Sequence, residues 1–154
     1  QDKTIINLVV LFICCIFVLN KTKYIMKYLD ITQFVLSYLA TASWVTADSD
    51  ENDEFTEDAK LDAKNDCLTF IALVISEFGV EEARPLLTTA GNDLTYLAPH
   101  DFFLTRNGHG AGFWDKPEKY GGQENADRLT AICQKMGEVE VYHIGEDNQS
   151  ELTF

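Results

Sequence analysis

The chain has 154 residues, of which 46% are hydrophobic, and this length and composition suit one compact domain with a buried core. Twelve lysine and arginine residues against 25 aspartate and glutamate residues give a formal net charge of -13. An electrostatic field of that sign repels nucleic acid and anionic membranes, and it favours basic partners. We therefore expect no direct binding to nucleic acid.

The first 25 residues differ in composition from the rest of the chain. Residues 5–19 are apolar apart from Asn7, but a membrane span needs about 20 residues, and no signal-peptide cleavage site follows. Met26 begins a stretch that is typical of the start of a protein. We expect residues 1–25 to be an apolar extension outside the functional domain and residues 26–154 to form that single domain. A membrane anchor in residues 5–19 is the alternative.

Two helices are predicted in the first half of the domain. Asp30 has the chemistry of an N-cap, and apolar residues follow it at helical spacing, which predicts a helix over 31–43. Thr56 is a good N-cap residue, and Gly79 can provide a left-handed C-terminal cap, so a second helix is predicted to begin after Thr56 and to run to about Phe78. Its broad apolar face predicts the central buried helix of the domain.

Two further helical segments are predicted later in the chain. Residues 80–87 indicate a short helix that is broken near Pro85. Residues 124–136 have apolar positions at helical spacing and end at Gly137, which predicts a last full helix.

The stretch 100–115, HDFFLTRNGHGAGFWD, concentrates rare residue types, because it holds two of the three histidines and one of the two tryptophans. Asp101 to Thr105 is rich in aromatic residues, and the pair Asn107-Gly108 is a strong hairpin signal, so we predict a β-hairpin over 101–114. Further strands are predicted at 138–144 and 150–154. The expected fold class is α+β, with three to four helices packed on a small, mainly antiparallel sheet.

Alternating glycines give the central stretch the properties of an anion-binding loop. Gly108, Gly110 and Gly112 let the backbone approach a ligand closely, and Arg106 can hold a phosphate or carboxylate. The spacing is not that of a dinucleotide fingerprint. A hairpin kept thin by glycines, with its aromatic side chains in the core, is the structural alternative. The candidate ligand-binding residues of this loop are Arg106, Asn107, Gly108, His109, Gly110, Gly112 and Trp114.

The same stretch contains residue types for acid-base chemistry, with His109, Arg106 and Asp115 as the catalytic candidates. No nucleophile is evident nearby, and His100 is expected either to cap the predicted strand or to bond to Asp101. The histidines and the four cysteines have no metal-ligand spacing, so we predict no metal site, no cofactor and no disulfide framework, as in the reduced cytoplasm.

A row of acidic residues gives a second candidate site. Asp58, Asp62 and Asp66 are spaced by four, which places them on one face of the predicted second helix. Such a row can bind a basic partner or mimic a phosphate backbone, and a solvated helix face is the structural alternative.

The motif HDFFLTRNGHGAGFWD, followed by ENADRLTAICQKMGEVEVYHIGEDN, resembles a family of small acidic proteins encoded mainly by bacteriophages and prophages. The resemblance covers residues 26–148 and is loose in the N-terminal half. Phe103 stands where tryptophan is common in the family, and the loop after Asp115 is longer here. The resemblance implies a virus-borne accessory protein in the bacterial cytoplasm, and it supplies no catalytic residues.

Together these observations predict a non-enzymatic phage accessory protein whose acidic face binds a host or viral protein. The first alternative is a small-molecule, nucleotide or hydrolytic site in the loop 106–115. The second alternative is a minor virion or assembly component, for which self-association is the distinguishing sign. No membrane partner is expected unless residues 5–19 belong to the protein.

Overall fold

A computed structural model describes Tyr24 and residues 27–46, 54–89, 96–144 and 149–153. The expected extension over 1–25 lies outside these residues, apart from Tyr24. The elements along the chain are α2 (Ile31–Val45), β1 (Glu54–Phe55), α3 (Glu57–Phe78), α4 (Val80–Leu87), α5 (Leu97–Arg106), the 3-10 helix η1 (Pro117–Tyr120), α6 (Gln123–Met136), β2 (Glu140–Ile144) and β3 (Gln149–Thr153).

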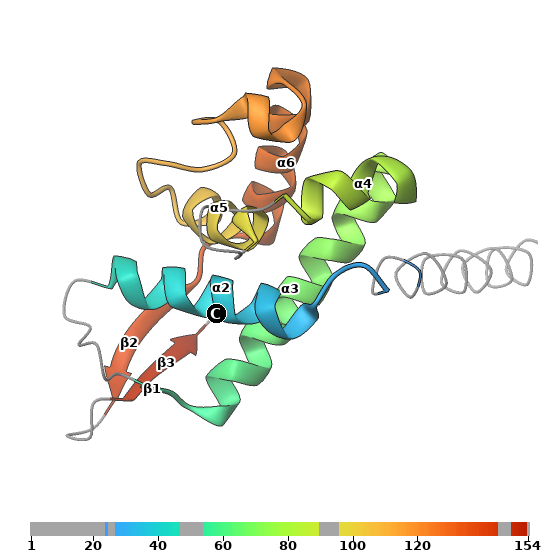
Figure 1. The fold of residues 1–154 in the computed structure, drawn as a ribbon. Coiled ribbons are helices and arrows are strands. Elements are labelled where there is room, and N and C mark those ends of the chain that lie inside the picture. Colours follow the sequence, from blue (N-terminus) through green and yellow to red (C-terminus); the bar gives the residue numbers. More distant parts are fainter. Residues whose placement is uncertain (1–23, 25–26, 47–53, 90–95, 145–148, 154) are drawn as a thin grey trace, which may run out of the picture.

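The described part of the chain is mainly helical, so the expected α+β class is wrong (Figure 1). The buried core comes almost entirely from the five helices α2 to α6, which pack on one another. The three short strands lie in the order β1-β3-β2 beside the N-terminal half of α3 and do not form a layer that the helices cover. Helix-on-helix burial supplies the hydrophobic core here, and the strands are peripheral.

The largest correction concerns the predicted hairpin over 101–114. Residues 97–106 form the helix α5, and the Asn107-Gly108 pair ends this helix. Gly108 has a φ of 64°, its N–H donates to the carbonyl of Thr105, and the N–H of His109 donates to the carbonyl of Leu104 at 3.1 Å. This pair of bonds is a Schellman motif, which closes a helix with the same left-handed glycine that a hairpin turn uses.

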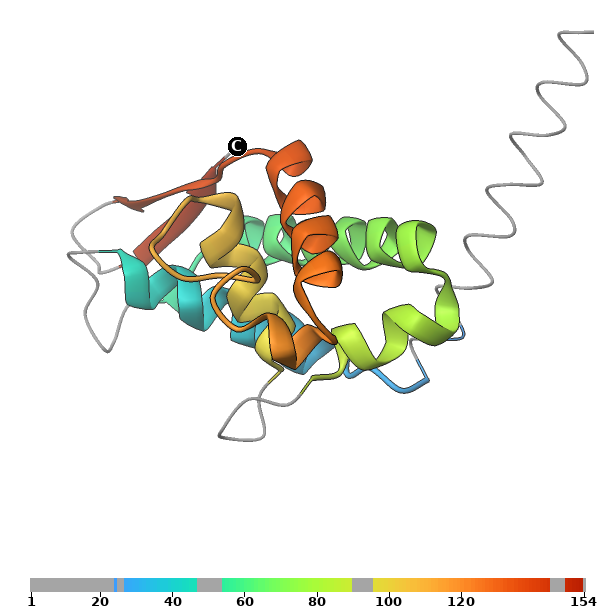
Figure 2. The same cartoon turned by 90° about the horizontal axis from the view of Figure 1, so that it is seen from above.

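Aromatic residues favour a strand locally, but burial on many sides decides the structure of α5. Phe102 and Phe103 are both buried, as are all residues from Asp101 to Arg106. The Phe102 ring stacks on Phe70 of α3 at 4.2 Å between centroids, and Tyr38 of α2 lies 5.2 Å from both α5 rings. The helix α5 therefore packs against α2, α4 and α6 (Figure 2), and its Phe102 ring also contacts α3 through Phe70.

The helices that have local capping signals are confirmed. Asp30 accepts from the N–H groups of Thr32 and Gln33, which starts α2, and Thr56 accepts from the N–H of Ala59, which starts α3. The helix α4 continues through Pro85, contrary to the predicted break. Proline removes one main-chain hydrogen bond, and burial of Leu86 and Leu87 holds the last turn of α4 on the core.

Two chain segments that are far apart in the sequence join in the sheet. Strand β3 pairs antiparallel with β2, and it pairs parallel with β1 at Glu54 and Phe55. The C-terminal strands that we predicted at 138–144 and 150–154 lie at Glu140–Ile144 and Gln149–Thr153. Strand β2 is an edge strand of this sheet. Among the described residues, no helix has the length and apolar character to cross a membrane.

Candidate functional site

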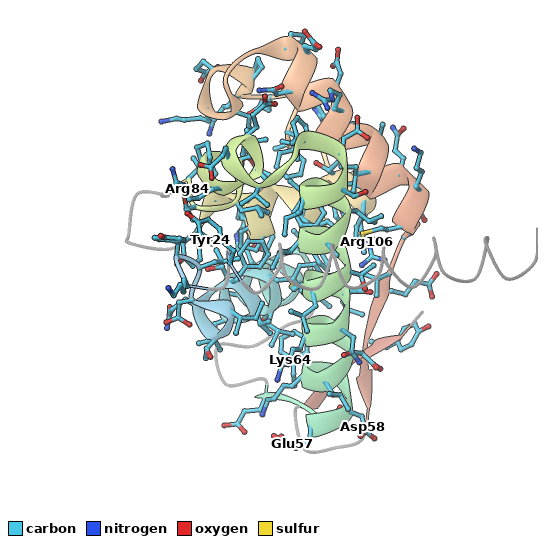
Figure 3. All side chains as sticks on the ribbon, turned by 90° about the vertical axis from the view of Figure 1, so that its right-hand side faces the viewer. Tyr24, Glu57, Asp58, Lys64, Arg84 and Arg106 are labelled. Atoms are coloured by element: carbon cyan, nitrogen blue, oxygen red, sulfur yellow. The ribbon has the colours of Figure 1, made fainter. Side chains whose placement is uncertain are left out.

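Arg106, a candidate for ligand binding and catalysis, lies in the interior between the helices (Figure 3). Its Nε donates to the carbonyl of Gly137 at 2.7 Å, and its guanidinium forms an ion pair with Asp66 of α3. The guanidinium also donates to the Tyr38 hydroxyl at 3.0 Å and lies near the carbonyl of Met136. One side chain on α5 thus bonds to α2, to α3 and to the C-terminal end of α6.

The charge on Arg106 is neutralised where it lies. Its side chain is 1% exposed, and the carboxylate of Asp66 and the negative end of α6 both face it. Burial lowers the pKa of Arg106, but Tyr38 and Asp66 raise it more, so the guanidinium stays charged. Burial also raises the pKa of Asp66, and the contact with Arg106 opposes that shift. Arg106 is therefore a structural ion-pair partner and is not available to a ligand.

The acidic row on α3 is divided by this ion pair. Asp58 is exposed and Asp62 is half-buried, whereas Asp66 turns to Arg106 and accepts from the Tyr38 hydroxyl at 3.5 Å. Figure 3 shows Asp58 at the N-terminal end of α3 and Arg106 beside the middle of the helix. Asp58 and Asp62 thus keep contact with solvent, whereas the carboxylate of Asp66 is occupied by its ion pair with Arg106.

A buried carboxylate, Asp101, lies five residues before Arg106 on α5. Asp101 is 6% exposed, and it accepts a hydrogen bond of 2.6 Å from the Tyr120 hydroxyl. Its other oxygen lies 3.0 Å from Nδ1 of His100, which is one of the two roles expected for that histidine; the other, capping a strand, is wrong because His100 lies in α5. Burial raises the pKa of Tyr120, and Asp101 raises it further, so the hydroxyl keeps its proton and donates. Asp101 thus fastens the loop around η1 to α5.

The glycine-rich loop is partly core and partly surface. Gly112 is buried, and a side chain there would collide with Oγ1 of Thr105, which accepts from the N–H of Phe113 at 3.1 Å. Phe113 is fully buried between Phe70 and Tyr120. Close approach of the backbone to the core therefore explains Gly112.

The exposed remainder of this loop consists of Gly108, His109, Gly110, Trp114 and Asp115. The His109 ring stacks on the buried Phe103 at 6.3 Å between centroids. Within the described residues, no hydrogen bond joins the His109 side chain to Asp115, and Arg106 is directed into the core. The three catalytic candidates are therefore not brought together as an acid-base set.

Asn107 connects the loop to the edge of the sheet. Its side-chain Nδ2 donates to the carbonyl of Phe103 at 3.1 Å, and its Oδ1 accepts from the N–H of Val139 at 2.8 Å. Asn107 and His109 are the two predicted ligand residues that also line a groove.

This groove has a volume of about 420 Å³ and lies between β2 and the C-terminal ends of α2 and α5. One wall is formed by Val45, Thr46, Phe103, Asn107 and His109, and the other by Glu138, Val139, Glu140, Val141 and Tyr142. Among the residues that the structure describes, the lining contains two carboxylates, three aromatic rings and no lysine or arginine. It can bind a group that is apolar in part and carries positive charge.

The sequence predicted a strand at 138–144 but did not indicate that this segment forms one wall of a groove. The alternation Glu138-Val-Glu-Val-Tyr142 indicates a strand with one polar face, and Glu140 and Tyr142 are indeed exposed while Val139 is buried. That signal places side chains on faces but carries no information on which other segment lies beside the strand. The contact between Asn107 and Val139 crosses 32 residues and has no local signature.

Metal or nucleophile chemistry has little support among the described residues. They contain no group of three or more histidine, cysteine, aspartate or glutamate side chains arranged to hold a metal ion. Cys67 and Cys133 are fully buried free thiols, and burial raises the pKa of each. Neither thiol is placed to act as a nucleophile.

Comparisons of the chain with protein-family models, with curated proteins and with solved structures find no match.

Proposed function

We propose that this protein is a non-enzymatic acidic binding protein that recognises a basic segment of a host or viral protein in the groove beside β2. The resemblance of the central motif suggests the setting, a bacteriophage accessory protein that acts in the bacterial cytoplasm. The observation that carries the proposal is the lining of the groove, in which Glu138 and Glu140 are exposed and the described residues include no lysine or arginine.

Charge supports a basic partner at two scales. The net charge of -13 draws cationic surfaces toward the molecule from a distance, which raises the rate of encounter. Within the groove, Glu138 and Glu140 give the positive groups of the partner local counterions, and the exposed rings of His109 and Tyr142 offer surface to the aliphatic stems of its side chains.

Two of the residues that suggested a nucleotide or hydrolytic site in the loop 106–115 have structural roles. Arg106 is bound inside the protein, and Gly112 is explained by contact with the core. The outward carboxylates Asp58 and Asp62 remain a second acidic surface, and the experiment below tests them beside the groove.

Affinity capture from bacterial lysate tests the proposal. The baits are the wild-type chain, Glu138→Lys with Glu140→Lys, and Asp58→Lys with Asp62→Lys. Glu118→Lys with Glu124→Lys is the control, because both residues are exposed outside the groove and the change in net charge is the same. We expect a partner that wild type and control retain and that the groove reversal loses, with equal melting temperatures.

Two outcomes would contradict the proposal. Equal capture by wild type and by the groove reversal would exclude the groove as the binding surface. Loss of capture only with the Asp58 and Asp62 reversal would show that the partner binds to the surface of α3 and not in the groove.

A further inference from the structure

Within the part of the chain that the structure describes, strand β2 is paired on one side only. Among the described residues, its ladder partner is β3, and the opposite edge of β2 borders the groove. The groove touches every residue from 138 to 142. Because successive side chains of a strand point to opposite faces, a hollow in contact with all five residues runs along the edge of the strand. The groove therefore gives access to the main chain of β2 as well as to its side chains.

The direction of the free main-chain groups follows from the bond at Val139. Val139 directly precedes β2, and its N–H donates to Oδ1 of Asn107, on the groove side. In an antiparallel ladder, the N–H and C=O of one residue point to the same edge, and those of the next residue point to the other edge. Counting from Val139, this alternation places the main-chain N–H and C=O of Val141 on the groove side. The main-chain N–H and C=O groups of Glu140 and Tyr142 then point to β3.

A free strand edge beside a hollow suits an extended peptide, which pairs its main chain with the edge and places alternate side chains in the hollow. The helix wall of the groove has an apolar side chain at Val45, which is partly buried, and Glu138 and Glu140 lie in the strand wall. If a second copy of this chain paired through the same edge, its Glu138 and Glu140 would lie near Glu138 and Glu140 of the first copy. Like charges opposite each other in a ladder are unfavourable. The charges therefore favour a basic segment over self-pairing.

We propose that an extended segment of the partner, with lysine or arginine alternating with apolar residues, adds to β2 as a further strand in this groove. The inference rests on the proposed function and names its mode of binding. It assigns to Val141 a main-chain contact with the partner, and to Glu138 and Glu140 the contacts with the positive side chains.

The test measures binding of a defined peptide, acetyl-Lys-Val-Lys-Val-Lys-Val-amide, to the full chain by calorimetry. Two versions carry N-methyl groups on the three valines or on the three lysines, and a peptide with glutamate in place of lysine is the charge control. We expect the unmodified peptide to bind, one N-methylated version to lose at least about tenfold in affinity, and the other to bind as before. The glutamate peptide should not bind.

Variants of β2 test the same point from the side of the protein. Val141→Pro removes one N–H from the groove edge and leaves the ladder with β3, since proline is tolerated where the N–H does not pair. We expect it to weaken the peptide about tenfold, and we expect Val141→Thr, which keeps the N–H, to bind normally. If Val141→Pro does not fold, the methylated peptides decide the question.

The outcomes separate the inference from the proposed function. Binding that is lost with Glu138→Lys and Glu140→Lys but unchanged by Val141→Pro and by both methylation patterns would overturn strand addition and keep the acidic groove. Failure of wild type to bind the peptide would overturn the inference, whereas the lysate capture would still test the function. A wild-type dimer that Val141→Pro converts to a monomer would show that a second copy occupies the edge and would also overturn it.

Discussion

Arg106 and Asp66 belong to two different candidate sites in the sequence, and in the folded protein they form an ion pair with each other. Their separation of 40 residues leaves no local pattern that would predict the contact. Residue types indicate which chemistry is available, but burial decides whether a ligand can reach it. An arginine beside glycines suits an anion, and here that arginine neutralises a carboxylate and the C-terminal carbonyl groups of α6.

Replacement of Arg106 should destabilise the fold strongly. Arg106→Met leaves the Asp66 carboxylate without its partner and the Gly137 carbonyl without its donor, so we expect the free energy of unfolding to fall by about 3 kcal/mol. Urea denaturation measures this loss. The double variant with Asp66→Asn should recover part of it, because the uncompensated charge is then gone. An unchanged denaturation midpoint for Arg106→Met would contradict the structural role.

Ser37 is the opposite case, a buried polar group that gains nothing from its position. Its Oγ is buried in α2 and has no hydrogen-bond partner in the described structure. Ser37→Ala removes the cost of burying that hydroxyl and favours the helix, so we expect stability to rise by up to about 1 kcal/mol. Thermal denaturation checks this result. Thr41→Ala is a useful contrast, because its hydroxyl bonds to the Ser37 carbonyl at 2.8 Å. A loss of stability in Ser37→Ala would mean that the hydroxyl has a function.

At the scale of elements, local signals were sufficient where a helix carries its own caps. Asp30, Thr56, Gly79 and Gly137 each predicted a helix end that the structure confirms. The signal failed at Asn107-Gly108, because a left-handed glycine ends a helix and turns a hairpin with equal ease. The surrounding helices selected between the two, since a helix over 97–106 buries its aromatic residues on several sides at once.

The glycines of the central loop should differ in their tolerance of substitution. Gly112→Ala places a methyl group against Oγ1 of Thr105, so we expect a loss of about 1–3 kcal/mol from overpacking. Gly110→Ala is the matched control, because its added methyl group would meet nothing within 4 Å, and we expect a change within about 0.5 kcal/mol. Chemical denaturation of both variants provides the comparison. Equal stability of the two would remove the packing explanation for Gly112.

At the scale of the whole molecule, composition predicted the sign of the electrostatic field but not where that field is used. Glu138 and Glu140 look ordinary in the sequence, and they become distinctive only because Asn107 holds their strand beside the ends of α2 and α5. The aspartate row was easier to see, since its spacing is local. The groove is formed by segments that meet only in the tertiary structure.

The proposed complex should depend on ionic strength. At an ionic strength of about 0.1 M, the attraction between exposed charges extends over a screening length of about 10 Å, and this length becomes shorter as salt is added. The affinity for the basic partner should therefore fall as sodium chloride rises from about 50 to about 500 mM. Calorimetric titration at several salt concentrations measures the effect, with the control variant Glu118→Lys with Glu124→Lys in parallel. The groove reversal should reduce the salt dependence more than the control does. Affinity independent of salt would indicate an apolar mode of recognition instead.

The contacts of Arg106 also bear on how the protein opens. A single guanidinium joins α2, α3 and the end of α6, so none of these segments can detach without exposing a charge that the others had neutralised. Partial unfolding is thereby disfavoured, and the most protected amides of these helices should show a common opening free energy, equal to that of global unfolding, in hydrogen exchange. The residue that looked most like a ligand contact in the sequence is thus the one that makes the domain cooperative.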